Sequence, residues 1–278
     1  MRKRGWIGAL VLFTALGAAV FAAQAFDDAK YPNFKGQWNR VGAPRWLAPG
    51  QKAPLTAEYQ AYYDAILKDQ DEGGVGNWPS AYCIPQGMPA MMNLFDPMEI
   101  VVTPETTYIL ISHVNDSYRR IYTDGRDWPA PDEVEPTYAG YSIGKWVDDD
   151  GDGSYDALEV ETRNFKGPRA FESTGLPLHK DNQTVIKERI YLDKSAADTL
   201  YDDITVFDHA LTRPWMLHKK AVRTEAARPV WISDLCEENN SLVHIGKETY
   251  FHDPDGVLMP MKKGQPPPDL RYFGQSQK

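Results

Sequence analysis

The twelve residues from Asp148 to Glu159 carry oxygen-bearing side chains at the spacing of a calcium-binding loop. They read Asp-Asp-Asp-Gly-Asp-Gly-Ser-Tyr-Asp-Ala-Leu-Glu, with Gly153 at the sixth position, where such loops bend sharply. Calcium takes about six to eight oxygen ligands, and crowded carboxylates repel one another unless a positive charge lies among them. The spacing predicts a calcium site with the ligands Asp148, Asp150, Asp152, the Ser154 carbonyl, Asp156 and Glu159. A solvated acidic hairpin tip is the alternative interpretation.

The segments on both sides of this loop alternate between apolar and polar residues. Tyr141 to Val147 precede the loop and Leu158 to Thr162 follow it, and a period of two indicates strands rather than the helices of an EF-hand. We therefore expect a β-hairpin that is clipped by calcium, with the ion in a structural role.

The first 25 residues resemble a secretory signal. Basic residues at positions 2 to 4 precede an apolar run over residues 7–21, and Ala23-Gln24-Ala25 offers small residues for cleavage after Ala25. An uncleaved anchor is the alternative, although the run is short for a spanning helix. We expect a periplasmic or secreted protein without stable membrane insertion after cleavage.

The composition predicts one acidic globular domain. The 278 residues carry a formal charge of −9, and loss of residues 1–25 removes three positive charges and no negative ones, which gives −12. Such a chain, without a dense basic run, is a poor partner for nucleic acid. We divide it into a signal peptide (1–25), a coil and helix that pack on a barrel (26–97), the barrel (98–259) and a Pro-rich tail (260–278).

The two cysteines, Cys83 and Cys236, are predicted to form a disulfide, because an exported chain with an even cysteine count favours pairing. Two free buried thiols are the alternative.

Hydrophobic periodicity predicts one helix followed by a run of strands. Thr56 can cap a helix whose apolar stripe ends near Gly73. From Met98 onward the period changes to two, and turn signals separate the runs. We expect a mainly β fold, a single antiparallel barrel with one N-terminal helix and long coil extensions, since a meander must hide its edges. The predicted strands are 98–103, 107–113, 118–123, 138–147, 157–165, 184–192, 199–207 and 214–222.

Strand parity places an acid in an aliphatic row. Glu188 shares its face with Ile186 and Ile190, and an inward carboxylate needs a cation or strong donors, or keeps its proton. In residues 118–124 the two arginines Arg119 and Arg120 lie on opposite faces, so one of them must face the barrel. We expect Arg120 to do so and to pair with Glu188.

The polar residues that parity brings together predict a ligand pocket, with Glu188 or His179 as a candidate base. The alternative is a buried Arg–Glu pair that fixes register and binds nothing. No two histidines have the spacing of a zinc site. The candidate ligand-binding residues are Arg120, Tyr122, Asp124, His113, Trp146, Asp208 and Trp215.

Five segments together resemble a large family of exported bacterial proteins of uncharacterised function. They are Cys83-Ile-Pro-Gln-Gly-Met-Pro, Arg119 to Arg126, Gly140 to Trp146, Val185 to Arg189 and Asp208 to Trp215. The resemblance covers residues 83–239 and implies a lipocalin-like or related antiparallel barrel, but no reaction. The chain departs from the family at Tyr141, where members often have His, and in the longer acidic hairpin.

Three functions remain open from the sequence. The first is binding of a small, largely apolar or aromatic ligand, since a barrel of about eight strands can hold one. The second is a cofactor-independent acid–base enzyme, an isomerase, lyase or hydrolase. The absence of the common nucleophile and nucleotide motifs weakens hydrolases of the common folds, but such an enzyme needs only one carboxylate or histidine in a dry pocket. The third is a calcium-dependent structural or interaction protein. No nucleotide or redox cofactor is expected.

Overall fold

The computed structural model describes residues 26–42, 46, 51–93, 96–113, 115–167, 169–236 and 241–271. The predicted signal peptide and residues 272–278 of the predicted tail lie outside this part of the chain. Within it, no helix combines the length and the apolar character that crossing a membrane requires.

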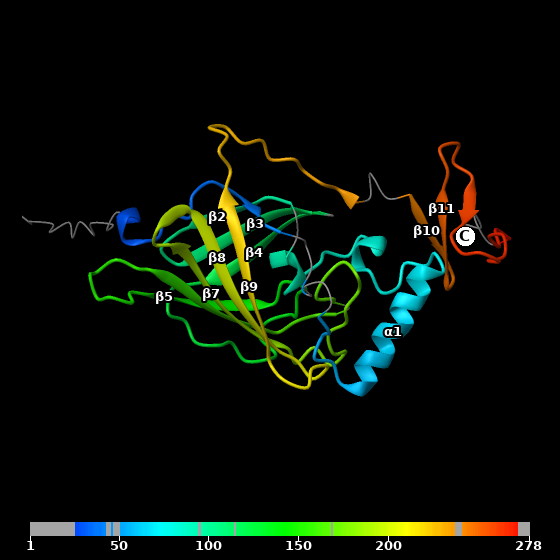
Figure 1. The fold of residues 1–278 in the computed structure, drawn as a ribbon, viewed down its shortest axis with the longest axis horizontal. Helices are drawn as coiled ribbons and strands as arrows, with labels where there is room; N and C mark the ends of the chain where they lie inside the picture. Colours follow the sequence, from blue (N-terminus) through cyan, green and yellow to red (C-terminus); the bar gives the residue numbers. More distant parts are fainter. Residues whose placement is uncertain are drawn as a thin grey trace, which may run out of the picture.

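Nine strands form a closed barrel in which each strand pairs with its neighbours in sequence and β9 pairs with β1 (Figure 1). This confirms the prediction of a mainly β fold built on a single barrel. The strands are β1 (Gln37–Arg40), β2 (Met98–Val102), β3 (Thr106–His113), β4 (Asn115–Tyr122), β5 (Tyr141–Val147), β6 (Ala157–Arg163), β7 (Val185–Asp193), β8 (Ala196–Phe207) and β9 (Trp215–Arg223).

The eight predicted strands correspond to β2 through β9, but β1 was predicted as coil. β1 pairs with β2 and β9, and Trp38 lies opposite both Met98 and Arg223. The Trp38 side chain is fully buried, and its indole N–H donates to the Phe34 carbonyl. Polar residues surround Trp38 in a strand of four residues, so periodicity gave no signal here.

One seam of the barrel is parallel and short. β4 and β5 are joined by a connection over residues 123–140, and only Ile121–Ser142 and Tyr122–Ile143 are in register. Gly144 lies beside this seam, where a Cβ atom would come within 2.6 Å of the Ile121 side chain. A glycine at this position therefore lets β5 approach β4 closely. The neighbouring β5–β6 ladder is antiparallel and pairs seven residues of each strand.

Alternate residues of the strands fill the barrel with aliphatic side chains, as a period of two requires. The fully or almost fully buried residues include Ile109, Ile121, Leu158, Ile186 and Ile204. The lumen is consequently a packed core with a few polar side chains embedded in it.

The one α-helix among the described residues lies outside the barrel. α1 (Ala57–Asp71) begins at Thr56, whose side chain accepts a hydrogen bond from the Tyr59 N–H, as predicted. Tyr59, Tyr63 and Ile66 are buried on its inner face, whereas Tyr62 is half exposed. Three short 3-10 helices accompany it: η1 (Asp28–Lys30), η2 (Pro79–Tyr82) and η3 (Ala90–Asn93).

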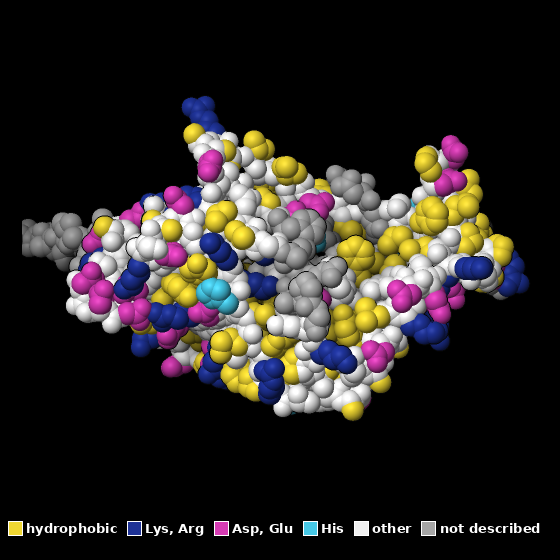
Figure 2. Space-filling model, viewed as in Figure 1, with side chains coloured by type: hydrophobic (Ala, Val, Ile, Leu, Met, Phe, Trp, Pro, Cys, Tyr) yellow, Lys and Arg dark blue, Asp and Glu magenta, His cyan; other side chains and the backbone are white. Residues whose placement is uncertain are grey.

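A second sheet of three strands lies beyond α1, away from the barrel (Figure 1). Its strands are β10 (Leu242–Ile245), β11 (Glu248–His252) and β12 (Leu258–Pro260). The Cys83–Cys236 disulfide, with a Cα–Cα distance of 5.4 Å, ties the segment before this sheet to the end of η2 and confirms the predicted pairing. Hydrophobic side chains gather toward this end of the molecule, whereas charges of both signs are interspersed over the barrel (Figure 2).

Candidate functional site

The barrel contains a buried ion pair between Arg119 of β4 and Glu188 of β7. Two hydrogen bonds, of 2.7 and 2.5 Å, join the guanidinium to both carboxylate oxygens. Arg119 also donates to Ser142 of β5 at 3.2 Å and to Thr162 of β6 at 2.7 Å. Both charged side chains are at most 1% exposed. Side chains of four strands thus form the hydrogen bonds that a buried ion pair needs to offset its desolvation.

Glu188 is inside the barrel as predicted, but its partner is Arg119 and not Arg120. The prediction that Arg119 and Arg120 lie on opposite faces of their strand was correct, but the prediction that Arg120 is the inward one was wrong. Arg119 shares its face with the fully buried Ile121, and this neighbour is the signal that identifies the inward face. Arg120 is exposed, and its guanidinium lies over the rings of Tyr108 and Tyr122.

A second carboxyl group, Asp202 of β8, lies next to this pair and borders a small cavity. Among the described residues, neither of its oxygens has a hydrogen-bond partner, and the same is true of the Arg40 Nη1 atom on the cavity wall. Asp96 and, on β9, Lys219 and Lys220 complete the polar lining. The cavity measures about 30 Å³, which is room for a few water molecules. Its apolar lining includes Trp38, Met91, Met98, Ile111 and Leu200.

Burial shifts the proton equilibria of these groups. Burial, followed by repulsion from Glu188, raises the pKa of Asp202 well above its ordinary value. Burial, together with the nearby Arg40, lowers the pKa of Lys219 to about 8. Burial and the neighbouring Glu188 therefore both favour the protonated form of Asp202.

A larger cleft lies outside the barrel, between α1 and the connection from β6 to β7. We call it the α1 cleft. Its volume is about 610 Å³, and its walls are Glu58, Tyr59, Tyr62, Asn77, Gly167, Arg169, Pro177, Leu178, His179, Lys180 and Asn182. The Tyr59 hydroxyl accepts a hydrogen bond from the Lys180 N–H at 3.0 Å, which joins the helix to the opposite wall.

Arg169 is the buried charge of the α1 cleft. The residue is 5% exposed, and its guanidinium donates to the Met88 carbonyl, Asn182 and Thr184. Its Nε atom has no hydrogen-bond partner, and it forms no ion pair with any carboxylate in the described part of the chain. Burial lowers the pKa of Arg169 to about 10.

Three predicted ligand-binding residues lie on the outer surface near the β4–β5 seam. Arg120 and Tyr122 line a groove of about 670 Å³. Arg126 lies over the Tyr122 ring at 3.7 Å and pairs with Asp124. Hydrogen bonds from Arg126 lower the pKa of Asp124 to about 2. This groove, which we call the seam groove, is separate from the α1 cleft in its lining residues.

The other predicted residues are spread over the barrel. His113 contacts Asp96 through Nδ1. Trp146 packs against Tyr31, and Trp215 packs against Trp46 and Phe171. These contacts describe packing, so the structure does not assemble the predicted ligand set at one place.

The acidic loop joins β5 to β6 as a hairpin, which confirms strands on both sides. Gly153 has a φ of +92°, consistent with the predicted sharp bend. Oxygens of Asp148, Asp150 and Asp156 lie within 4.8 Å of one another. Positive charge is already present, however: Lys194 contacts Asp156 at 3.0 Å and Asp150 at 3.5 Å.

Two of the predicted calcium ligands have other partners. Glu159 pairs with Arg189 at 2.9 Å, and an Asp152 oxygen accepts the Ser154 N–H at 2.8 Å. Calcium binding therefore stays a prediction.

Three groups that shape these sites were missed in the sequence. Asp202 lay in the inward row of its predicted strand and was overlooked in favour of Asp208 at the end of that row. Arg169 lies in an irregular segment, where parity gives no information. Asp181 joins His179 to His209, and only folding brings these residues together.

Comparison of the chain with protein-family models, with curated proteins and with solved structures gives no match. The resemblance drawn from the motifs remains a prediction, and the function must be argued from the geometry of this chain.

We expect Arg119→Met and Glu188→Gln each to lower the free energy of unfolding by about 3–5 kcal/mol, because each change strands a buried partner. The double variant R119M/E188L should regain most of that loss. Arg120→Met is the matched control and should change stability by less than about 0.5 kcal/mol. Urea unfolding measures all four, and a Glu188→Gln variant of unchanged stability would contradict a structural role for the pair.

Asp202→Asn should stabilise the protein increasingly as pH rises. The pKa of Asp202 is higher in the folded state than in the unfolded state. The wild-type residue therefore does not destabilise the fold through its charge below the unfolded-state pKa of 3.8, and this destabilisation grows as pH rises toward the folded-state pKa. The charged groups nearby are Glu188, Arg119, Asp203 and Lys219, and the variant leaves them in place. Unfolding free energies of both proteins at pH 4.5 and 7.5 test this. An equal difference at the two pH values would show that Asp202 is ionised in the folded protein.

Calcium is expected to raise the melting temperature of metal-free mature protein. At about one hundred times the dissociation constant, the gain in unfolding free energy is about 2.7 kcal/mol. Asp150→Asn should reduce this effect, and Lys194→Met should increase it by removing a competing ammonium group. Thermal unfolding in EDTA and in calcium is the measurement. Identical melting temperatures would identify the loop as a solvated acidic tip with Lys194 and Arg189 as counter-ions.

Proposed function

We propose that the protein is an exported β-barrel protein that binds a small ligand in the α1 cleft. The ligand has an apolar or aromatic body and an anionic group. The observation that carries this proposal is the buried guanidinium of Arg169, which lines the cleft without a carboxylate partner in the described residues.

Volume favours the α1 cleft over the interior of the barrel. Small-molecule sites occupy about 300–1,000 Å³. The α1 cleft, with about 610 Å³, falls within this range, whereas the cavity at Asp202 offers about 30 Å³. The original expectation of a ligand inside the barrel is therefore replaced by a site on its outside.

Electrostatics supports an anionic ligand. A buried charge is costly unless it is paired, and the groups that accept hydrogen bonds from Arg169 are all neutral, while Asp208 and Asp181 act on it only from beyond direct contact. The planar guanidinium suits bidentate binding of a carboxylate or phosphate. Lys180, on the same wall, adds a second positive charge.

The remaining walls suit an apolar body. Tyr59 and Leu178 are buried, and Tyr62 exposes half of its surface at the edge of the cleft. Tyr59 also packs against His179, with ring centroids 5.0 Å apart and the rings tilted by 34°, so two aromatic rings are held in place before a ligand arrives.

The seam groove is the competing surface, and its charges are already compensated. Arg126 is paired with Asp124, and Arg120 is exposed to water. Neither arginine needs a ligand to offset burial, so the groove offers a weaker driving force for an anion.

An acid–base enzyme inside the barrel has less support. Glu188 is held by Arg119 and cannot act as a free base, and the raised pKa of Asp202 belongs to a cavity of water size. Export itself is supported by the signal sequence and by the disulfide, a pairing typical of oxidising compartments.

The test is binding of 2-naphthoate and of its neutral analogue 2-naphthamide, measured by isothermal titration calorimetry. We expect wild-type protein to prefer the carboxylate, and Arg169→Gln to lose at least about tenfold in affinity for it, because a charged hydrogen bond is removed. The amide should bind weakly to both proteins.

Arg120→Gln is the matched control and should bind 2-naphthoate like wild type. Tyr62→Ala offers a second variant at an exposed wall, in case Arg169→Gln folds poorly. If binding depends on Arg120 instead of Arg169, the site is the seam groove. If wild type binds neither compound at millimolar concentration, the proposed ligand class is wrong.

A further inference from the structure

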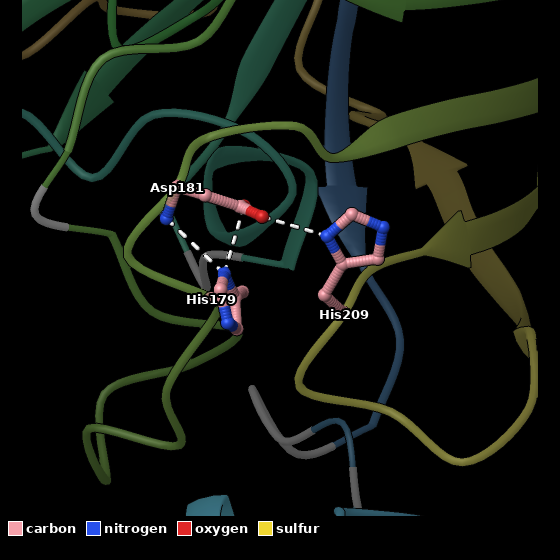
Figure 3. A group of neighbouring side chains, drawn as sticks. All are labelled: His179, Asp181 and His209. Carbon is pink, nitrogen blue, oxygen red and sulfur yellow. Dashed lines mark hydrogen bonds and ion pairs between the residues drawn. The ribbon is translucent and has the colours of Figure 1, made fainter.

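Two histidines and one aspartate meet at the edge of the α1 cleft (Figure 3). His179 and Asp181 belong to the connection before β7, and His209 belongs to the turn after β8. We call these three residues the His cluster. Both imidazole rings turn toward the Asp181 carboxylate, which lies between them.

Asp208 holds the two segments of the cluster together. Its Oδ1 atom accepts the His179 N–H at 2.9 Å and the Ala210 N–H at 2.8 Å. Its Oδ2 atom accepts the Thr184 hydroxyl at 2.6 Å. The backbone on both sides of the cluster is therefore fixed by one carboxylate that is not itself part of the cluster.

The donor atoms converge closely. The Nδ1 atom of His179 lies 2.8 Å from Asp181 Oδ1, and the Nδ1 atom of His209 lies 2.6 Å from Asp181 Oδ2. One atom from each residue falls within a mutual distance of 4.8 Å. A metal ion about 2.0–2.1 Å from each ligand needs separations of about 3.3 Å, which small rotations of these side chains supply.

The contacts at His179 fit either a proton or a metal ion between its ring nitrogen and Asp181. The Nδ1 atom of His179 faces a carboxylate oxygen of Asp181 at 2.8 Å and the Asp181 N–H at 3.2 Å. This nitrogen has one lone pair, so a proton on it is donated to the carboxylate, whereas a metal ion takes one lone pair from the nitrogen and one from the oxygen. Either one replaces the contact with the Asp181 N–H.

We propose that His179, Asp181 and His209 bind one divalent transition-metal ion, with zinc as the reference ion. Two imidazoles and one carboxylate form a ligand set typical of such ions. Three protein ligands leave coordination positions open, as in catalytic rather than structural zinc sites. The Asp181 and His209 residues are solvent-exposed, so water can occupy those positions.

This inference goes beyond ligand binding in the α1 cleft and does not depend on it. The two are connected by His179, which lines the cleft and belongs to the His cluster. The ion would lie at the rim of the cleft, where a ligand of the cleft has access to an open coordination position.

The alternative is a hydrogen-bonded clasp in which a shared carboxylate holds two imidazoles without metal. The clasp and the metal site predict different results for the same variant. In the clasp, loss of His209 lowers the melting temperature of metal-free protein and leaves zinc affinity as weak as at any surface histidine.

The test is titration of EDTA-treated, desalted full-length protein with Zn²⁺ by calorimetry, repeated with Co²⁺ by visible absorption. We expect one equivalent to bind, with a Co²⁺ spectrum that reports nitrogen ligands. His209→Ala and Asp181→Asn should each lower zinc affinity at least about tenfold. His209 is the preferred variant because its side chain is 68% exposed.

His218→Ala is the matched control, since His218 is an exposed histidine that contacts one aspartate, Asp203, at 2.5 Å through Nδ1. It should bind zinc like wild type. The proposal is overturned if wild type does not bind zinc, if His209→Ala binds it equally well, or if the loss follows Asp150→Asn and places the ion in the acidic hairpin.

Discussion

The bidentate ion pair between Arg119 and Glu188 is the interaction on which the rest of the barrel depends. Arg119 starts on β4, contacts Ser142 on β5 and Thr162 on β6, and ends on Glu188 of β7. Its side chain thus crosses the parallel β4–β5 seam, where the backbone ladder has only two residue pairs. Across this seam, hydrogen bonds from the Arg119 side chain connect neighbouring strands that elsewhere in the barrel are connected by backbone hydrogen bonds.

That pair also decides where a ligand can be held. The network and the aliphatic rows occupy the lumen, and the cavity beside Asp202, in the described part of the chain, has a volume of about 30 Å³. The roomier sites lie outside, where α1 and the long connections meet the barrel. Asp208 serves this outer region by fixing the connections that carry His179 and His209, much as Arg119 fixes the strands.

The sequence predicts the strands well because burial of alternate residues is a local constraint. It predicts which residues share a face, as at Glu188, but the choice between the two faces of β4 has only one local signal, the apolar Ile121 on the face of Arg119. The Ser142 and Thr162 hydroxyl groups of β5 and β6, which hold the Arg119 guanidinium, are distant in sequence, and no local pattern reveals them. β1 and the His cluster were missed for a related reason, since the pairing of β1 and the contact between Asp181 and His209 involve residues distant in the chain.

The pairing of β1 with β9 sets the topology of folding. Trp38 and Arg223 lie at opposite ends of the barrel sequence, and joining them closes a very long loop, which is slow because entropy is lost before contacts form. The Cys83–Cys236 bond spans most of that loop, with a separation of 153 residues. Once it has formed, the path along covalent bonds from β1 to β9 is much shorter. A disulfide that forms before the barrel closes therefore shortens the loop that the β1–β9 pairing has to close and lowers the entropic cost of that closure.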